Sequence, residues 1–141
     1  MTDPGSVGRW VLYTDGASRG NPGAAGAGWV LFDAEQNLIE RGNAYLGVKT
    51  NNEAEYEAML RGLRAAHAAG AQTLGVRADS ELLVKQLRGE YRVKNPKLRP
   101  LYEAVVGVLR NFASVDVAHV RRDDNRQADR EANLAIDAHR S

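Results

Sequence analysis

The hydrophobic pattern changes its period near residue 50, and this change restricts the fold more than any other feature of the chain. Upstream, apolar segments alternate with a period of two; downstream, helical spacing alternates with strand-like segments. Three consecutive strands with short connections pair antiparallel, whereas strands separated by helices pair in parallel. The sequence therefore predicts an α/β fold with a mixed five-stranded sheet, three antiparallel strands and then two parallel ones, flanked by helices. The predicted strands are residues 10–15, 27–33, 38–48, 73–80 and 115–120.

The segment 50–70 carries the strongest helix signals. Apolar side chains recur at helical spacing between Tyr56 and Ala66, and the segment closes at Gly70, a residue type that favours helix C-termini. Thr50 and Glu53 form the pattern of a capping box at its start, so we expect Glu53 to serve the helix rather than chemistry. Further helices are predicted at residues 81–87, from about Pro100 within 95–112, and at 124–139.

Composition limits the class of protein. With 141 residues and 43% apolar side chains, the chain has the size of one domain, predicted at residues 9–139 after a disordered lead-in at 1–8. Cys is absent, which excludes a disulfide framework and a thiolate zinc site and is compatible with a reducing compartment. No segment has the roughly 20 apolar residues needed to span a bilayer, and residues 1–9 lack signal-peptide features. We therefore expect a cytoplasmic protein with no membrane partner.

The net charge of +1 does not by itself indicate a nucleic-acid-binding protein, but the charge is unevenly distributed. One segment contains a single acid, Glu90, among six basic side chains. On charge alone a solvated helix-and-loop surface is the simpler interpretation, and a patch for a polyanion is the alternative. The six basic residues are Lys85, Arg88, Arg92, Lys94, Lys97 and Arg99.

Four acidic residues occupy positions where acids are unusual. Asp15 and Asp79 end predicted strands, whereas Glu55 and Asp129 lie in the first turns of predicted helices. Each has a simple structural explanation: Asp15 could organise a turn, Asp79 could cap a helix, and the other two could complement a helix dipole. Asp129 also precedes Ala132 by three residues, so it shares the inward face of its helix.

Considered jointly, the four positions favour a shared site. Ligands of open α/β sheets bind beyond the carboxyl ends of strands, where Asp15 and Asp79 are predicted, and helix starts can face the same edge. Clustered carboxylates repel one another unless cations join them or some protonate. Oxygen ligands without Cys or grouped His favour Mg²⁺, with Mn²⁺ as an alternative. A pair of such ions about 3.5–4 Å apart activates water and stabilises the leaving oxygen in phosphodiester cleavage.

Residues 16–28 contain five glycines and one proline. We expect a tight hairpin turn there, with backbone able to come close to a ligand because glycine lacks a Cβ. The segment has neither the G-x-x-x-x-G-K-[ST] pattern nor the order of the dinucleotide fingerprint, which argues against a nucleotide cradle. Ser18 and Ser80 have no evident histidine base, which disfavours a serine triad, and the three histidines are not spaced as metal ligands.

Five short motifs occur in sequence along the chain: TDGASRGNPG at 14–23, TNNEAEY at 50–56, ADS at 78–80, YRVKN at 91–95 and NRQAD at 125–129. In this order and at these intervals they resemble type 1 ribonuclease H, and the match covers Trp10 to about His139. The resemblance implies the fold above and an endonuclease that hydrolyses the RNA strand of RNA–DNA hybrids with two metal ions. Its products would carry 5′-phosphate and 3′-hydroxyl ends. It assigns catalysis and metal binding to Asp15, Glu55, Asp79 and Asp129.

The same resemblance implies the substrate contacts. Asn21, Asn51 and Asn52 match residues that bind the minor groove of the hybrid, and Thr50 matches one that binds a DNA phosphate. Amides can donate to and accept from a 2′-hydroxyl, and a helix N-terminus attracts phosphate, so the chemistry agrees. The implied partners are RNA–DNA hybrids and, as in some compact members, double-stranded RNA; no obligate protein partner is evident. A catalytically weak hybrid- or duplex-binding module is the alternative function.

The chain departs from the family pattern in two places. No basic protrusion is inserted in residues 87–102, so we expect modest and salt-dependent hybrid affinity. The loop histidine that assists product release in the family has two possible alignments. Counting back from Asp129 without a gap reaches His119, whereas aligning the strands leaves a shorter loop that contains no histidine. We prefer the second alignment, in which Arg121 or Arg122 occupies this region.

Overall fold

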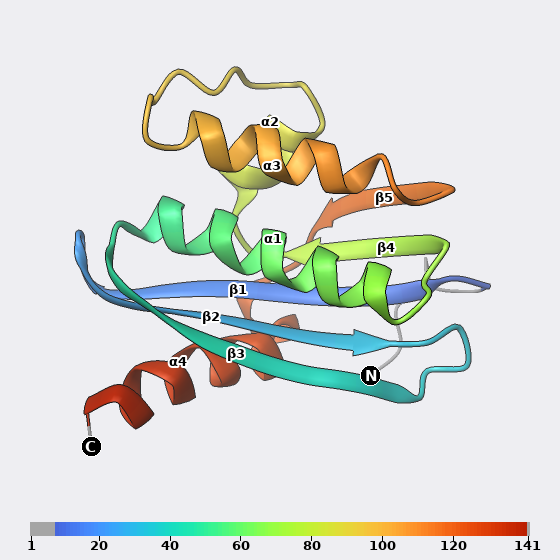
Figure 1. Cartoon of the computed structure of the whole chain (residues 1–141), viewed down its shortest axis with the longest axis horizontal. Helices are drawn as coiled ribbons and strands as arrows, with labels where there is room; N and C mark the ends of the chain where they lie inside the picture. The colour runs from blue at the N-terminus through green and yellow to red at the C-terminus, as the bar shows by residue number, and fades with distance from the viewer. Residues whose placement is uncertain (1–7, 141) are drawn as a thin grey trace.

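The computed structural model describes residues 8–140 (Figure 1). The predicted lead-in at 1–8 lies outside the described residues except for Gly8, so it stays a prediction. Within the described chain, no helix combines the length and the apolar character needed to cross a bilayer. The strands are β1 (Trp10–Gly20), β2 (Gly23–Phe32), β3 (Leu38–Lys49), β4 (Thr73–Ala78) and β5 (Ser114–His119). The helices are α1 (Asn51–Ala68), α2 (Glu81–Leu87), α3 (Arg99–Leu109) and α4 (Arg126–Arg140), with a short 3₁₀ helix, η2 (Arg122–Asp124).

The five strands form one mixed sheet in the order β3-β2-β1-β4-β5. β1 pairs antiparallel with β2, and β2 pairs antiparallel with β3. β4 joins the other side of β1 in parallel, and β5 extends this parallel half. The predicted α/β class and mixed sheet are confirmed. β1 is the central strand and belongs to both halves, so residues on it lie where the two types of pairing meet.

Helices cover both faces of the sheet (Figure 1). On one face Leu12 of β1 packs in the main core with Met59 of α1, and side chains of α2 and α3 complete that core. On the other face Val11 and Tyr13 of β1 pack against Ala128 of α4. The alternation along β1 thus follows the period of two that the sequence shows. α4 packs against β1, β2 and β3, and Ala128 in its first turn lies against β1 and β2, near the centre of the sheet.

The hairpin turn in the glycine-rich segment is tight, as predicted, but most of residues 16–28 are paired strand rather than turn. β1 continues to Gly20 and β2 begins at Gly23, which leaves Asn21 and Pro22 as the turn. The two strands are paired in one continuous antiparallel register. β1 is therefore 11 residues long, longer than the strand of about six residues that was predicted.

The glycines in these strands permit close packing of helices. A Cβ at Gly16 would overlap the backbone of Ala54 in α1, and a Cβ at Gly28 would overlap the carbonyl oxygen of Ala128 in α4. Glycine is the residue type that allows such an approach of one backbone to another. The segment therefore brings the starts of α1 and α4 close to the centre of β1.

The N-terminus of α1 has the predicted capping box. Thr50 Oγ1 accepts a hydrogen bond from the Glu53 backbone N–H at 3.2 Å, and Glu53 Oε1 accepts one from the Thr50 N–H at 2.9 Å. The Thr50 N–H also holds the pKa of the Glu53 carboxyl below its usual value. Glu53 therefore serves the helix, as the sequence predicts, and α1 ends before Gly70, which has a positive φ of 96°.

Candidate active site

A cleft forms where the parallel half of the sheet ends. β1 and β4 pair as far as Thr14 and Ala78, and the next residues are Asp15 and Asp79. The sequence predicts that Asp15 ends its strand. In the structure β1 continues to Gly20, and beyond Thr14 it pairs with β2 alone. Asp15 nevertheless directly follows the last β1–β4 pair, as Asp79 does, so the two residues lie side by side on neighbouring chain segments.

The other two predicted acids come from helices on opposite faces of the sheet. Glu55 is buried in α1, one residue beyond the first turn in which it was predicted, because the helix begins at Asn51. The close contact between Gly16 and α1 places Glu55 beside β1, and the Gly16 backbone hydrogen-bonds to its carboxylate. Asp129 lies in the first turn of α4, as predicted.

The structure brings all four acids to one cleft. Carboxylate oxygens of Asp15, Glu55 and Asp79 lie within 4.8 Å of one another, an arrangement that could hold a metal ion. Asp129 lines the same cleft, whose volume is about 500 Å³. The remaining residues that line it are Gly16, Ala17, Ser18, Arg19, Asn51, Arg122 and Asn133.

Burial and mutual repulsion make the cluster costly without cations. Asp15 is 5% exposed and Glu55 is 9% exposed. Burial, and then the negative charges of Glu55 and Asp79, raise the pKa of Asp15 to about 11. Burial likewise raises the pKa of Glu55 to about 8. Near neutral pH the cluster therefore retains protons that an incoming cation would displace.

The donor atoms fit a hard divalent cation. The three gathered side chains offer only carboxylate oxygens, which suit Mg²⁺ and Mn²⁺ better than zinc. Glu55 Oε2 is buried and has no hydrogen-bond partner within the described residues. A buried carboxylate oxygen without a partner is unfavourable, and coordination by a cation would satisfy it.

The predicted substrate contacts gather at the N-terminus of α1. Asn21, in the β1–β2 turn, accepts a hydrogen bond from the Asn51 backbone N–H through Oδ1 at 3.0 Å. Thr50 caps the helix, and Asn51 also lines the acidic cleft. Asn52 is exposed in the first turn. The structure thus places these four residues in one region beside the acids, although their contacts with substrate stay predictions.

His119 lies in a strand, as the preferred alignment requires. It is the last residue of β5, where it pairs with Ala78 of β4, and it is absent from the residues that line the acidic cleft. The loop from β5 to α4 contains no histidine, and Arg122 from this loop lines the cleft. A positive side chain from this loop therefore lies at the acidic cleft, and its correspondence to the family's loop histidine stays a prediction.

The basic segment Lys85–Arg99 is only partly neutralised. Three of its basic side chains form ion pairs with Glu81, Glu90 and Glu103. Arg92, Lys94 and Lys97 form none among residues 8–140. The buried side chains of Val93 and Leu98 anchor this part of the chain to the core. Both interpretations of the segment, a solvated surface and a polyanion patch, are compatible with this arrangement.

One polar residue at the site was not singled out from the sequence. Asn125 is 1% exposed, and its side-chain Nδ2 donates to Asp79 Oδ2 at 3.1 Å. It is the first residue of the motif NRQAD and precedes a helix, a position at which Asn usually acts as a cap. Capping alone would explain an Asn at this position, so the sequence does not indicate its hydrogen bond to Asp79. That bond forms only because the end of β4 and the start of α4 come together in the fold.

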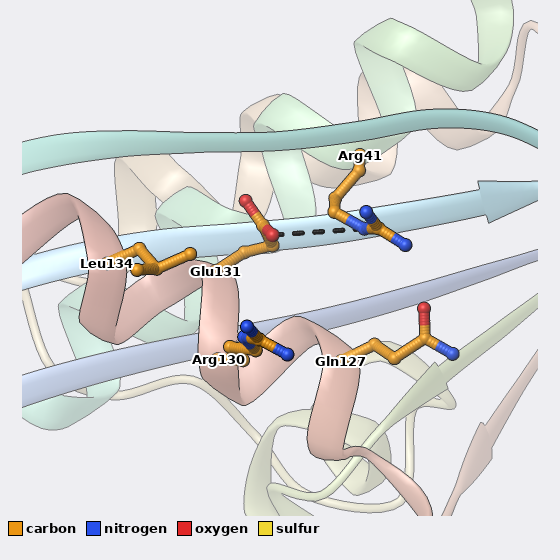
Figure 2. Close-up of a pocket in the computed structure, with 5 residues that line it drawn as sticks. All are labelled: Arg41, Gln127, Arg130, Glu131 and Leu134. Carbon is orange, nitrogen blue, oxygen red and sulfur yellow. Dashed lines mark ion pairs between the residues drawn. The ribbon is translucent and has the colours of Figure 1, made fainter.

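A second cleft, of about 400 Å³, lies between α4 and Arg41 of β3 (Figure 2). Its one carboxylate, Glu131, accepts a hydrogen bond from Asn43 Nδ2 at 2.9 Å and lies 3.9 Å from Arg41 Nε. Arg130 and Leu134 line the cleft alongside this pair. Because its single acid already has partners, this cleft lacks the grouped carboxylates that mark the first one as the candidate active site.

Comparisons with known proteins show which proteins the chain resembles. A family model described as "Reverse transcriptase-like" matches residues 13–135. Ribonuclease HI of Halobacterium salinarum is 39% identical over 137 residues, which cover 97% of this chain and 69% of that protein. The bifunctional protein Rv2228c of Mycobacterium tuberculosis is 40% identical over 129 residues, which cover 91% of this chain. The chain spans only 35% of that longer relative.

Solved structures show the same fold at similar identity. RNase H1 from Halobacterium salinarum superposes with a TM-score of 0.90 at 40% identity, over 93% of this chain and 99% of that one. LC11-RNase H1, isolated from compost, was solved in complex with an RNA/DNA hybrid. It superposes with a TM-score of 0.89 at 38% identity, over 94% of this chain and 100% of that one. The chain therefore belongs to the type 1 ribonuclease H family.

Proposed function

We propose that the chain is an endoribonuclease that hydrolyses the RNA strand of RNA–DNA hybrids with two divalent metal ions. The observation that carries the proposal is the gathering of four acids, from β1, β4, α1 and α4, around one cleft. Family membership supports the same reaction, and so does the hybrid bound to LC11-RNase H1. The products would carry 5′-phosphate and 3′-hydroxyl ends.

In this proposal the carboxylates of Asp15, Glu55, Asp79 and Asp129 hold the metal ions. Mg²⁺ is the expected ion, and Mn²⁺ is the expected substitute. When bound, such ions lower the pKa of water and stabilise negative charge on a leaving oxygen. The protein supplies carboxylate oxygens from β1, the end of β4, α1 and α4, so little reorganisation is needed when cations and substrate arrive.

Substrate selection would depend on the region at the N-terminus of α1. Asn21, Asn51 and Asn52 would bind 2′-hydroxyls and base edges in the minor groove, which distinguishes RNA from DNA. Thr50 would bind a phosphate of the DNA strand, where the helix N-terminus favours an anion. Arg122 would place positive charge beside the scissile phosphate, because its side chain lines the acidic cleft.

Several further expectations accompany this proposal. Hybrid would be the main substrate, and double-stranded RNA a second one. The chain would act without an obligate protein partner and in the cytoplasm. Its hybrid affinity would fall steeply with salt, because phosphate contacts release counterions.

Cleavage of three duplexes tests the proposal. RNA–DNA hybrid, RNA duplex and DNA duplex of one sequence, each labelled on either strand, are incubated with protein and Mg²⁺ at several salt concentrations. We expect cuts in the RNA strand of the hybrid and none in DNA, with loss of cleavage in EDTA. Asp79→Asn, folded but inactive, is the control for contaminating nuclease. A folded, Mg²⁺-supplied protein that leaves the hybrid intact contradicts the proposal.

A further inference from the structure

Asn125 is the residue through which three of the four acids are connected. It lies between η2 and α4 and is 1% exposed, in a chain whose other fully buried large side chains are almost all apolar. A buried amide is unfavourable unless its hydrogen-bonding groups are satisfied. The position of Asn125 therefore needs a physical reason.

Both protons of the Asn125 amide are used at the cleft. Nδ2 donates to the Thr14 backbone carbonyl at 2.9 Å and to Asp79 Oδ2 at 3.1 Å. Both partners are acceptors, so the nitrogen must face them and the carboxamide has one orientation. Thr14 precedes Asp15 and is the last β1 residue paired with β4. The side chain thus links the end of the β1–β4 ladder to the carboxylate that follows β4.

The backbone of Asn125 provides a third connection. Its carbonyl oxygen accepts a hydrogen bond from the Asp129 N–H at 3.1 Å. Asp129 lies in the first turn of α4. One residue therefore contacts the strand that carries Asp15, the side chain of Asp79 and the backbone of Asp129. It therefore bridges the elements that carry these three acids.

The remaining polar atom of Asn125 argues against a purely structural role. Oδ1 is buried and has no hydrogen-bond partner in the part of the chain that the structure describes. An apolar side chain of similar size would avoid this unpaired acceptor. Asn is thus poorly suited to stabilising the fold here, whereas its N–H groups are suited to orienting a carboxylate.

We propose that Asn125 is a positioning residue: its amide fixes the Asp79 carboxylate relative to Asp15 and Asp129, and the affinity of the cluster for Mg²⁺ depends on it. The inference rests on the proposed metal site. Partners that orient metal-binding side chains typically change metal affinity or activity by about 10- to 100-fold when they are removed. Asn125 acts through Asp79 and needs no contact with substrate.

The test compares Mg²⁺ binding by purified wild type, Asn125→Leu and Asn125→Ser, measured by calorimetry with MgCl₂ alone. Asn125→Leu keeps the size but loses both donors, and we expect its dissociation constant to rise at least about tenfold. Asn125→Ser retains one donor and a residue type that caps helices, so we expect an intermediate loss. With labelled hybrid, added Mg²⁺ should restore much of the cleavage rate of Asn125→Leu, while the KM for hybrid stays near that of wild type.

Asn43→Leu is the matched control. It removes another amide-to-carboxylate hydrogen bond, from Asn43 Nδ2 to Glu131 Oε1, that lies outside the acidic cleft. We expect this variant to bind Mg²⁺ like the wild type. A structural role of Asn125 would change the unfolding temperature in EDTA and leave the Mg²⁺ affinity of the folded variant unchanged.

The possible outcomes separate this inference from the proposed function. Wild-type Mg²⁺ affinity in a folded Asn125→Leu overturns the inference alone, since the wild type still cleaves hybrid. Should Asn125→Leu fail to fold, Asn125→Ser decides by the same criterion. Failure of both to fold would make Asn125 a structural residue and would also overturn the inference. A wild type that binds no Mg²⁺ would instead contradict the metal site itself.

Discussion

Replacing Asp15 by Asn should make the metal-free protein more stable while abolishing cleavage. Asp15 is 5% exposed, and its pKa is raised from 3.8 to about 11 by burial and then by Glu55 and Asp79. At pH 7 the unfolded chain has released the Asp15 proton, but the folded chain keeps it because its pKa lies above 7. The free energy of unfolding of the wild type is therefore lowered by the pH interval from 3.8 to 7, which is at most about 4 kcal/mol. Allowing for relaxation of the cleft, we expect Asp15→Asn to gain about 2 kcal/mol or more. Its amide can still donate to Glu55, as the protonated carboxyl does.

The stability gained by Asp15→Asn should depend on pH. Below about pH 4 the Asp15 carboxyl is protonated in both the folded and the unfolded chain, so it carries no penalty there. As the pH rises toward the folded-state pKa, only the unfolded chain releases the proton, and the wild type loses stability. The advantage of Asp15→Asn should therefore be small near pH 4 and large at pH 7.

Thermal unfolding in EDTA measures the effect. For a chain of this length, about 2 kcal/mol corresponds to a rise in unfolding temperature of roughly 6–8 °C. Added Mg²⁺ should raise the unfolding temperature of the wild type and leave Asp15→Asn nearly unchanged, because ligand binding stabilises only a competent site. Glu35→Gln, an exposed acid in the β2–β3 turn, is the control and should match the wild type. An unfolding temperature of Asp15→Asn at or below that of wild type at pH 7 would refute the reasoning.

Three further variants test the elements that build the cleft. Gly16→Ala should lose about 1–3 kcal/mol in urea unfolding because its Cβ would overlap the backbone of α1; wild-type stability would mean that the helix does not lie so close. Thr50→Ala should lose about 1 kcal/mol with its cap, whereas Thr50→Ser keeps it; equal stabilities of the two variants would contradict the capping role. Arg122→Ala should fold normally and lose roughly tenfold to hundredfold in kcat/KM on labelled hybrid, since it removes positive charge from the cleft. The exposed Arg121→Ala is its control, and equal rates for the two variants would remove Arg122 from the site.

The order of elements could be predicted from the sequence because periodicity is a local property. Changes from a period of two to helical spacing identify strands and helices directly, and the capping box of Thr50 and Glu53 marks the start of α1. The acids could be predicted to converge because the ends of parallel strands and the starts of helices meet at one edge of an α/β sheet. The location of Asp79 directly after β4 follows from that rule.

The glycine-rich segment could not be interpreted correctly from the sequence. Glycine is common in turns and depleted in strands, so residues 16–28 favour a turn locally. In the structure, Gly16 and Gly28 are in strands because α1 and α4 pack against them. Contacts between residues so distant in sequence leave no local pattern. For the same reason the continuation of β1 beyond Asp15 was not foreseen.

The contribution of Asn125 was also beyond sequence reasoning. An Asn before a helix already has a sufficient local explanation as a cap. Its burial, and the hydrogen bond to Asp79 at 3.1 Å, appear only when the residue after β4 and the residue before α4 come together beside β1. Residues that position a site are therefore harder to find from sequence than residues that form it, because a local role can account for them.

The central claim is that the four acids form one binding site for divalent cations. Crystals of Asp129→Asn, with hybrid and Mn²⁺ present, test it most directly through the anomalous scattering of manganese. We predict anomalous peaks within coordination distance, about 2.0–2.3 Å, of carboxylate oxygens of Asp15, Glu55 and Asp79. An ordered cleft with no anomalous peak, at an Mn²⁺ concentration that supports cleavage by the wild type, would contradict the account.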